Sequence, residues 1–241
     1  MKPKSPEWGR HGLDLSAALR IVRHAGISPP GREGAYDDEQ VQRLIDALCD
    51  LSVHDGLTGL VNATFFQAAL ATEIDRSART GRTCALLVID LDYFKSINDS
   101  YGHQAGDRVL QTAARLMRRS LRGMDTAARI GGEEFAVILP ECPPEAAIHA
   151  ARRIHSGLNP FTVECGGSAL NLTSSAGLAW TEPRRAESAR ELLARADREM
   201  YRAKKSGRHQ LCYPAVVATE ISPSERSVLL SLTELEAGDD R

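Results

Sequence analysis

Two segments of the 241-residue chain constrain its fold more than any other feature. Residues 84–89 form the apolar run CALLVI, which leads directly into the acids Asp90 and Asp92, and residues 129–140 read RIGGEEFAVILP. The first pattern is typical of a buried strand that ends in carboxylates. The second predicts a β-hairpin with the Gly-Gly-Glu-Glu sequence 131–134 as its turn. Glycine tolerates the positive φ that we expect in such a turn, and it lets a ligand approach the backbone.

The order of the expected elements predicts an α+β fold. It contains a β-α-β-β-α-β series, which is the ferredoxin-like or palm arrangement: an antiparallel central sheet flanked by helices. The right-handed crossover rule makes the strand at 126–130 parallel to the strand at 84–90, with the strand at 135–139 between them. We expect helices at 62–79, 104–121, 144–157 and 189–205, and strands at 84–90, 126–130, 135–139, 161–165, 170–180 and 210–213.

In this topology the hairpin turn and the end of the first strand fall on the same edge of the sheet. Glu133 and Asp90 are then expected to meet, although they are far apart in sequence. Hard oxygen ligands with an aromatic residue and a lysine nearby suit Mg²⁺ that holds a nucleotide phosphate. The sequence therefore predicts a divalent metal site at this edge.

The termini differ in composition from the central region. Residues 1–37 form an extension and linker, with SPPGREG at 28–34 and one short helix expected around 13–22. Residues 38–51 form a helical lead-in whose apolar stripe packs either on its own domain or on a second copy. The main domain is expected at 52–213. A polar tail follows at 214–241, with a short helix near 225–235.

Composition excludes several classes of protein. The formal net charge of −2 gives no basic field, so nucleic-acid binding is not expected. Five scattered cysteines without a C-x-x-C pair favour reduced thiols in a cytoplasm. No apolar run approaches the ~18 residues of a membrane span. The N-terminal MKPKSPEWGRHG lacks the apolar region of a signal peptide.

Four motifs together resemble a known family. They are DGLTGLVN (55–62), IDLDYFKSINDSYGHQAGD (89–107), RIGGEEF (129–135) and ADREMYRAKKSGR (196–208). Their order and spacing closely resemble the GGDEF family of diguanylate cyclases, here with a GGEEF hairpin. The resemblance covers roughly residues 52–213.

The resemblance implies that Mg²⁺ (or Mn²⁺) is bound by Asp90, the carbonyl of Leu91 and the carboxylate of Glu133. Glu133 is also implied as the general base for the ribose 3′-hydroxyl, and Glu134 lies beside the site as a further catalytic candidate. Asp92 supports the loop. A solvated acid at a strand end is the alternative for Asp90.

Several cations and one turn are candidates for binding the triphosphate. Backbone N–H groups in the turn at Tyr93, Phe94 and Lys95 can hold phosphate oxygens, and Lys95 adds a charge that stabilises the reacting phosphates. The resemblance places Lys204 and Arg208 on the terminal phosphate. The alternatives are an ordinary surface lysine at 95 and, at 204 and 208, cations that complement a helix dipole.

The resemblance also assigns a guanine pocket. Asn98 and Asp107 read the guanine edge, His103 contributes to the pocket, and Gly131 and Gly132 let the nucleotide approach. A carboxylate accepts from guanine N1–H and N2–H₂ together, which adenine cannot offer, and an unpaired buried acceptor costs roughly 1–3 kcal/mol. Alternatively, Asp107 is a first-turn helix acid and His103 a residue of the helix start.

A second ligand site is implied just ahead of the hairpin. Arg122 and Asp125 match the RxxD motif that binds the cyclic dinucleotide product in the family, with Arg153 as an assisting cation. A surface ion pair on a loop is the alternative.

The resemblance implies condensation of two GTP into 3′,5′-cyclic di-GMP and two pyrophosphates by a homodimer, with product inhibition. A catalytically silent receptor for GTP or cyclic di-GMP is the alternative, and another nucleotidyl cyclase is a third. Two positions depart from the family pattern, His209 in place of Asn and Ala63 in place of Arg. Neither affects the metal ligands.

Overall fold

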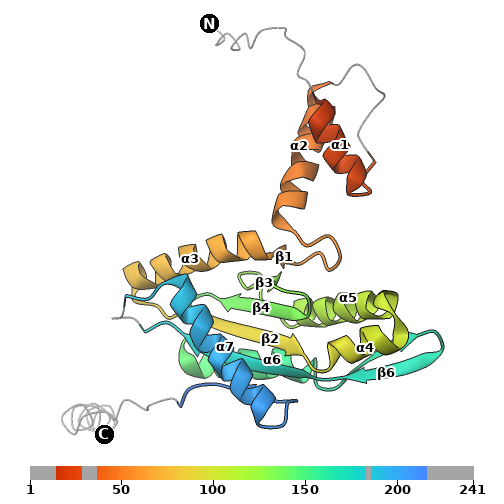
Figure 1. Ribbon diagram of the computed structural model, residues 1–241. Coiled ribbons are helices and arrows are strands. Elements are labelled where there is room, and N and C mark those ends of the chain that lie inside the picture. The colour runs from red at the N-terminus through yellow and green to blue at the C-terminus, as the bar shows by residue number, and fades with distance from the viewer. Residues whose placement is uncertain (1–14, 29–36, 183–185, 216–241) are drawn as a thin grey trace, which may run out of the picture.

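The computed structural model describes residues 15–28, 37–182 and 186–215. Its centre is a six-stranded, mostly antiparallel sheet with the strand order β1-β3-β4-β2-β7-β8, flanked by helices (Figure 1). This α+β arrangement confirms the predicted fold class. The strands of the sheet are β1 (Val61–Asn62), β2 (Ala85–Leu91), β3 (Thr126–Arg129), β4 (Glu134–Leu139), β7 (Ser174–Trp180) and β8 (Leu211–Cys212).

The described helices are mostly those expected from sequence periodicity. A separate hairpin, β5 (Phe161–Cys165) with β6 (Ser168–Leu172), lies outside the main sheet. The helices are α1 (Ser16–His24), α2 (Asp38–Val53), α3 (Ala63–Thr80), α4 (Phe94–Tyr101), α5 (His103–Arg119), α6 (Pro144–Ser156) and α7 (Ala189–Lys205).

The pairing of the inner strands follows the predicted topology. β4 lies between β3 and β2 and is antiparallel to both, which makes β3 parallel to β2. On its other side β2 pairs antiparallel with β7. Every residue of β2 is buried, because the strand has neighbours on both edges and helices on both faces.

The two faces of the sheet carry separate apolar layers. Leu86 and Val88 point toward α3 and α7, whereas Leu87 and Ile89 point toward α5 and α6. This alternation follows from the two-residue period of a strand. The end of β2 is therefore held on every side, and the residues that follow Ile89 begin from a rigid position.

The helices α1 and α2 form a pair that extends away from the sheet (Figure 1). Asp37 caps α2, with its side chain accepting from the Gln40 N–H while the Gln40 side chain accepts from the Asp37 N–H. Val22 of α1 and Leu44 of α2 are buried. The apolar stripe of α2 thus meets α1, and α2 contacts the main domain at β1 and α3.

Several details differ from the sequence expectations. The expected strand at 170–180 is two strands, β6 and β7, which belong to different sheets. The segment after Tyr93 forms helix α4 rather than a simple turn. The expected helix at 225–235 lies outside the described residues. Among the described helices, none is both long and apolar enough to cross a membrane.

Helix α7 approaches the sheet very closely at Gly177 of β7. A Cβ on this residue would lie 2.1 Å from the backbone nitrogen of Met200 and 2.2 Å from the carbonyl oxygen of Ala196. Both atoms belong to the helix backbone, which cannot yield as a side-chain end can. Glycine at this position therefore fixes how close α7, with Lys204 near its end, lies to the sheet.

Gly177→Ala is expected to lower the free energy of unfolding by about 1–3 kcal/mol, because the added methyl forces α7 outward. Equilibrium unfolding in urea measures this change. Gly56→Ala is the matched control, since no atom lies within 4 Å of its added Cβ. Equal stability of the Gly177→Ala variant and the wild type would contradict the close packing.

Candidate active site

Asp90 is the second-to-last residue of β2 and has a nearly buried carboxylate, 4% exposed. It stands opposite Glu134 of β4 and Ser175 of β7 in the sheet. Its Oδ2 atom lies 2.7 Å from Nζ of Lys204, in the last turn of α7. Burial raises the pKa of Asp90, and the hydrogen-bonded Lys204 ammonium only partly offsets this effect. Asp90 is therefore a buried acid with one cationic neighbour.

The hairpin turn brings Glu133 to the same place. The N–H of Leu91 donates to the carbonyl of Glu133 at 3.3 Å, so the turn is attached to the end of β2. Burial and the charge of Asp90 raise the pKa of Glu133, and Glu134 adds to this shift. The structure thus brings Asp90, Leu91, Glu133 and Lys204 together, as the topology predicted for Asp90 and Glu133.

The two glycines of the turn were expected to adopt positive φ, but the structure shows a different reason for glycine there. Neither Gly131 nor Gly132 has φ in the left-handed region. Instead, a Cβ on Gly131 would lie 2.4 Å from Oε2 of Glu134, so glycine makes room for that side chain. Gly132 faces open space, with no atom within 4 Å of an added Cβ. That space is compatible with close approach of a ligand.

Asp92 has a different environment from Asp90, although it is equally buried. Its carboxylate accepts from the hydroxyls of Thr173 and Ser175, both at 2.7 Å, and from the backbone N–H of His209 at 3.1 Å. These donors occupy both oxygens. Asp92 therefore joins the end of β2 to the start of β7 and to the loop after α7, which agrees with its expected supporting role.

The loop after α7 brings a second cation to the site. Arg208 and His209 both have positive φ, and the guanidinium of Arg208 lies 4.7 Å from the ring centre of Tyr93. Tyr93 itself adopts the left-handed conformation and precedes α4, whose first N–H groups are available to an anion. Lys95 is exposed in the first turn of α4. Phe94 is buried and anchors the helix.

Helices α4 and α5 hold the residues expected to read a base. A Cβ on Gly106 of α5 would lie 2.0 Å from Oδ1 of Asn98 on α4, so glycine at this position allows the Asn98 side chain to rest against α5. Asp107 is the next residue, and both it and His103 are exposed on α5. The side chain of Asn98 therefore lies beside the helix that carries Asp107.

Arg122, Asp125 and Arg153 gather near the end of α5. The N–H of Arg122 donates to Oδ2 of Asp125 at 2.8 Å, which closes a turn. Arg153 of α6 donates to the carbonyl of Ser120 at 3.1 and 3.2 Å. Within the described part of the chain, the exposed Arg122 guanidinium forms no ion pair. Its charge is available to a ligand.

The residues at the end of β2 fit a small hard cation. Burial is the main cause of the raised pKa of both carboxyl groups, and neighbouring acids add to it, so a bound cation would offset the cost of ionising them there. The described residues contain no cluster of three or more His, Cys, Asp or Glu side chains arranged for a metal. Mg²⁺ does not require one, since it usually keeps waters and binds through one or two carboxylates plus substrate phosphates.

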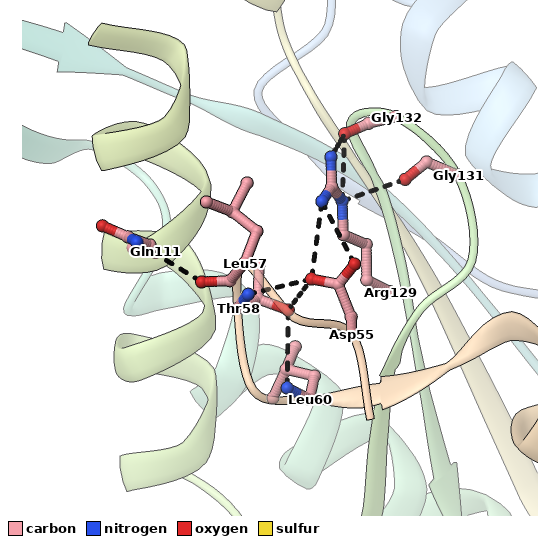
Figure 2. Close-up of polar contacts among 8 residues, drawn as sticks. All are labelled: Asp55, Leu57, Thr58, Leu60, Gln111, Arg129, Gly131 and Gly132. Atoms are coloured by element: carbon pink, nitrogen blue, oxygen red, sulfur yellow. Dashed lines mark hydrogen bonds and ion pairs between the residues drawn. The ribbon is translucent and has the colours of Figure 1, made fainter. Parts of the chain in front are cut away.

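Two residues that border this site, Arg129 and Asp55, had no role predicted from the sequence. Arg129, the last residue of β3, donates to the carbonyls of Gly131 and Gly132 and contacts the carboxylate of Asp55 (Figure 2). Asp55 and Arg129 both belong to motifs identified in the sequence, DGLTGLVN and RIGGEEF. Their 74-residue separation concealed the contact.

The family model for "Diguanylate cyclase, GGDEF domain" matches residues 52–210. The chain belongs to this GGDEF family. It is 41% identical over 160 residues to the probable diguanylate cyclase DgcC of Escherichia coli, a match that covers 66% of this chain and 43% of DgcC. It is 40% identical over 167 residues to the response regulator PleD of Caulobacter vibrioides, which covers 68% of this chain and 37% of PleD. The chain therefore matches less than half the length of either relative.

Solved GGDEF structures resemble the whole domain. Diguanylate cyclase SiaD of Pseudomonas aeruginosa, crystallised with its activator SiaC, has a TM-score of 0.66 at 33% identity, covering 83% of this chain and 72% of SiaD. The GGDEF domain of DgcB from Caulobacter crescentus, in complex with c-di-GMP, has a TM-score of 0.63 at 32% identity. That match covers 67% of this chain and 95% of the DgcB domain.

Glu133→Gln is expected to stabilise the metal-free protein slightly at pH 7, because it removes a charge that the site disfavours and that solvent only partly screens. The raised pKa of Glu133 means that its ionisation costs more in the folded state than in the unfolded chain. This cost is absent below the ordinary pKa of glutamate, ~4.3. The advantage of the variant should therefore disappear near pH 3.

Urea unfolding with EDTA at both pH values measures the effect. Glu164→Gln, at an exposed position of β5, is the control and should leave stability unchanged. A Glu133→Gln variant that is less stable than the wild type at pH 7 would contradict the reading of this site.

Proposed function

We propose that the chain is a diguanylate cyclase that condenses two GTP into 3′,5′-cyclic di-GMP with release of two pyrophosphates. One observation carries the proposal: the Glu133 turn is hydrogen-bonded to the end of β2, beside Asp90 and within the charge field of Lys204. Family membership supports it.

Asp90, the Leu91 carbonyl and Glu133 would hold Mg²⁺ (or Mn²⁺). When bound, this ion would neutralise phosphate charge and make the ribose 3′-hydroxyl more acidic. Glu133 is then the general base that accepts the proton of that hydroxyl. The 3′-oxygen forms a bond to the α-phosphorus of the second GTP, and the bond from that phosphorus to pyrophosphate breaks.

The triphosphate is positioned by groups around the start of α4 and the end of α7. The backbone N–H groups after Tyr93 and the side chain of Lys95 face one end of the phosphates. Arg208, stacked on Tyr93, and Lys204 face the terminal phosphate. With a cation held by Asp90, Lys204 would be able to leave this carboxylate and contact the phosphate instead.

Guanine recognition falls to Asn98 and Asp107, with His103 at the rim of the pocket. One domain holds one GTP, so it cannot present both the attacking hydroxyl and the α-phosphate that is attacked. Catalysis therefore requires two domains facing each other as a homodimer, and much of the rate gain comes from this proximity.

The activity test is incubation of the purified chain with Mg²⁺ and GTP, followed by chromatography of the products. Asp90→Ala is expected to lower turnover at least about 100-fold while the protein stays folded. Asp75→Ala, an exposed acid on α3, is the control and should keep the wild-type rate. Wild-type turnover in Asp90→Ala would refute the metal-site assignment. Binding of GTP without any turnover by the wild type would instead favour a silent receptor.

The second site is proposed to bind the product and inhibit. Among the described residues the exposed guanidinium of Arg122 has no ion-pair partner, and Arg153 lies near the same turn, so two cations can meet the phosphates of cyclic di-GMP. The site lies at the start of β3, whereas the catalytic turn follows the end of that strand. Product bound there would hold two domains in an unproductive arrangement.

Arg122→Ala is expected to relieve inhibition by added cyclic di-GMP without lowering the initial rate. Progress curves with and without added product measure both quantities, and inhibition of the wild type should be non-competitive with GTP. Arg119→Ala, an exposed arginine at the end of α5, is the control and should remain inhibited. Inhibition of Arg122→Ala as strong as that of the wild type would mean that Arg122 and Asp125 form only a surface turn.

A further inference from the structure

The guanidinium of Arg129 lies between the catalytic turn and the loop that precedes β1 (Figure 2). Its Nε atom lies 3.2 Å from the carbonyl of Gly131 and 3.3 Å from that of Gly132, and Nη2 donates to Gly132 at 2.8 Å. Its Nη1 atom contacts both carboxylate oxygens of Asp55, at 3.3 and 3.4 Å. A single side chain thus connects two motifs that are far apart in sequence.

The turn needs such a contact because the strand ladder does not hold its tip. The N–H groups of Ile130 and Gly131 both donate to the carbonyl of Glu134, which closes the base of the hairpin. The carbonyl of Glu133 accepts from Leu91. The carbonyls of Gly131 and Gly132 have Arg129 as their donor. Arg129 and β2 therefore hold the turn from two sides, with Glu133 between them.

Asp55 is itself fixed by its own loop. It accepts from the N–H of Thr58 at 2.8 Å and from the Thr58 hydroxyl at 2.6 Å. Burial alone would raise the pKa of Asp55, but the Thr58 hydrogen bonds and the Arg129 charge outweigh it and lower the pKa. Asp55 therefore stays ionised at neutral pH. The anion opposite Arg129 is permanent and has a fixed position.

The loop that carries Asp55 is attached to α5 by separate contacts. Arg118 donates to the carbonyl of Thr58 at 3.0 Å, and Gln111 lies 3.4 Å from the carbonyl of Leu57. Arg118 thus supports the same loop without reaching the turn. This arrangement provides a second arginine, close in position and chemistry, whose removal loosens the loop alone.

We propose that Arg129 is a positioning residue that holds the Gly131–Gly132 turn so that Glu133 faces Asp90, with Asp55 orienting Arg129. This role deepens the proposed function, on which it rests, and it explains why DGLTGLVN accompanies the hairpin motif. Arginine suits the task because its planar fork has five N–H donors in fixed directions. Lysine would keep the charge but could not hold two carbonyls and a carboxylate in one plane.

Even a small displacement of the turn is expected to lower the reaction rate and the metal affinity strongly. Glu133 has no direct bond to Arg129, so loss of the guanidinium acts only through the backbone of the turn. Misplacement of a reacting group by about 1 Å can cost about 100-fold in rate. Loss of a residue that orients a metal ligand typically lowers metal affinity or activity by about 10–100-fold.

The test is Mn²⁺ titration followed by electron paramagnetic resonance, in the presence of a non-hydrolysable GTP analogue. Arg129→Ala and Arg129→Lys should each weaken Mn²⁺ affinity about 10–100-fold. Arg118→Ala is the matched control and should bind Mn²⁺ as the wild type does. Asp55→Asn, which retains an acceptor for Thr58 but loses the charge, should show a smaller loss in the same direction. Asp55→Asn also provides the test if Arg129→Ala does not fold.

The steady-state rates give a second readout. Arg129→Ala should lower kcat and leave the KM for GTP nearly unchanged, because the proposed base-reading and phosphate-binding residues lie on α4, on α5, in the last turn of α7 and just after it. Mn²⁺ affinity in Arg129→Ala equal to that of the wild type would overturn the proposal, as would an equal loss in Arg118→Ala. Full recovery in Arg129→Lys would also overturn it, since charge alone would then suffice.

These measurements test the proposed cyclase activity and the positioning role of Arg129 separately. A wild-type chain that makes no cyclic di-GMP but loses Mn²⁺ affinity on substitution of Arg129 would refute the cyclase assignment and support the positioning role. A wild-type chain that binds no Mn²⁺ would overturn the metal site and the positioning role together.

Discussion

The antiparallel pairing of β2 with β4 determines how the acids of the candidate site meet. In this register Asp90 stands opposite Glu134, and the next N–H along β2 donates to the carbonyl of Glu133. A shift by one residue would turn Asp90 to the other face of the sheet. The register is fixed by the apolar residues of β2, which alternate between two cores. Packing far from the site thus sets its geometry.

The site concentrates negative charge on this rigid frame. Asp90 is nearly buried, and the pKa values of Asp90 and Glu133 are both raised. In the absence of a metal, Lys204 supplies the cation at 2.7 Å. Gly177 keeps α7 close enough for that contact. Asp92, whose oxygens are occupied by three donors, ties the same strand end to the loop that carries Arg208. Asp90 is thus the acid that we propose for chemistry, whereas its neighbour Asp92 maintains the structure.

Sequence patterns predicted what depends on local periodicity. The bounds of α7 and the hairpin of β3 and β4 follow directly from apolar spacing and glycine placement, and the order of β3, β4 and β2 follows from crossover handedness. Long-range side-chain contacts could not be predicted in this way. Asp92 binds Ser175 across 83 positions, and Arg129 reaches Asp55 across 74. The role of Gly131 also could not be predicted from the sequence, because it depends on where the Glu134 side chain lies.

The central claim is that Asp90, the Leu91 carbonyl and Glu133 form one divalent metal site. The most direct test is anomalous X-ray scattering from crystals grown with Mn²⁺ and a non-hydrolysable GTP analogue. We expect a peak between the two carboxylates, with Lys204 moved from Asp90 to the triphosphate. No peak at this position, with Lys204 still paired to Asp90 while the nucleotide is bound, would contradict it.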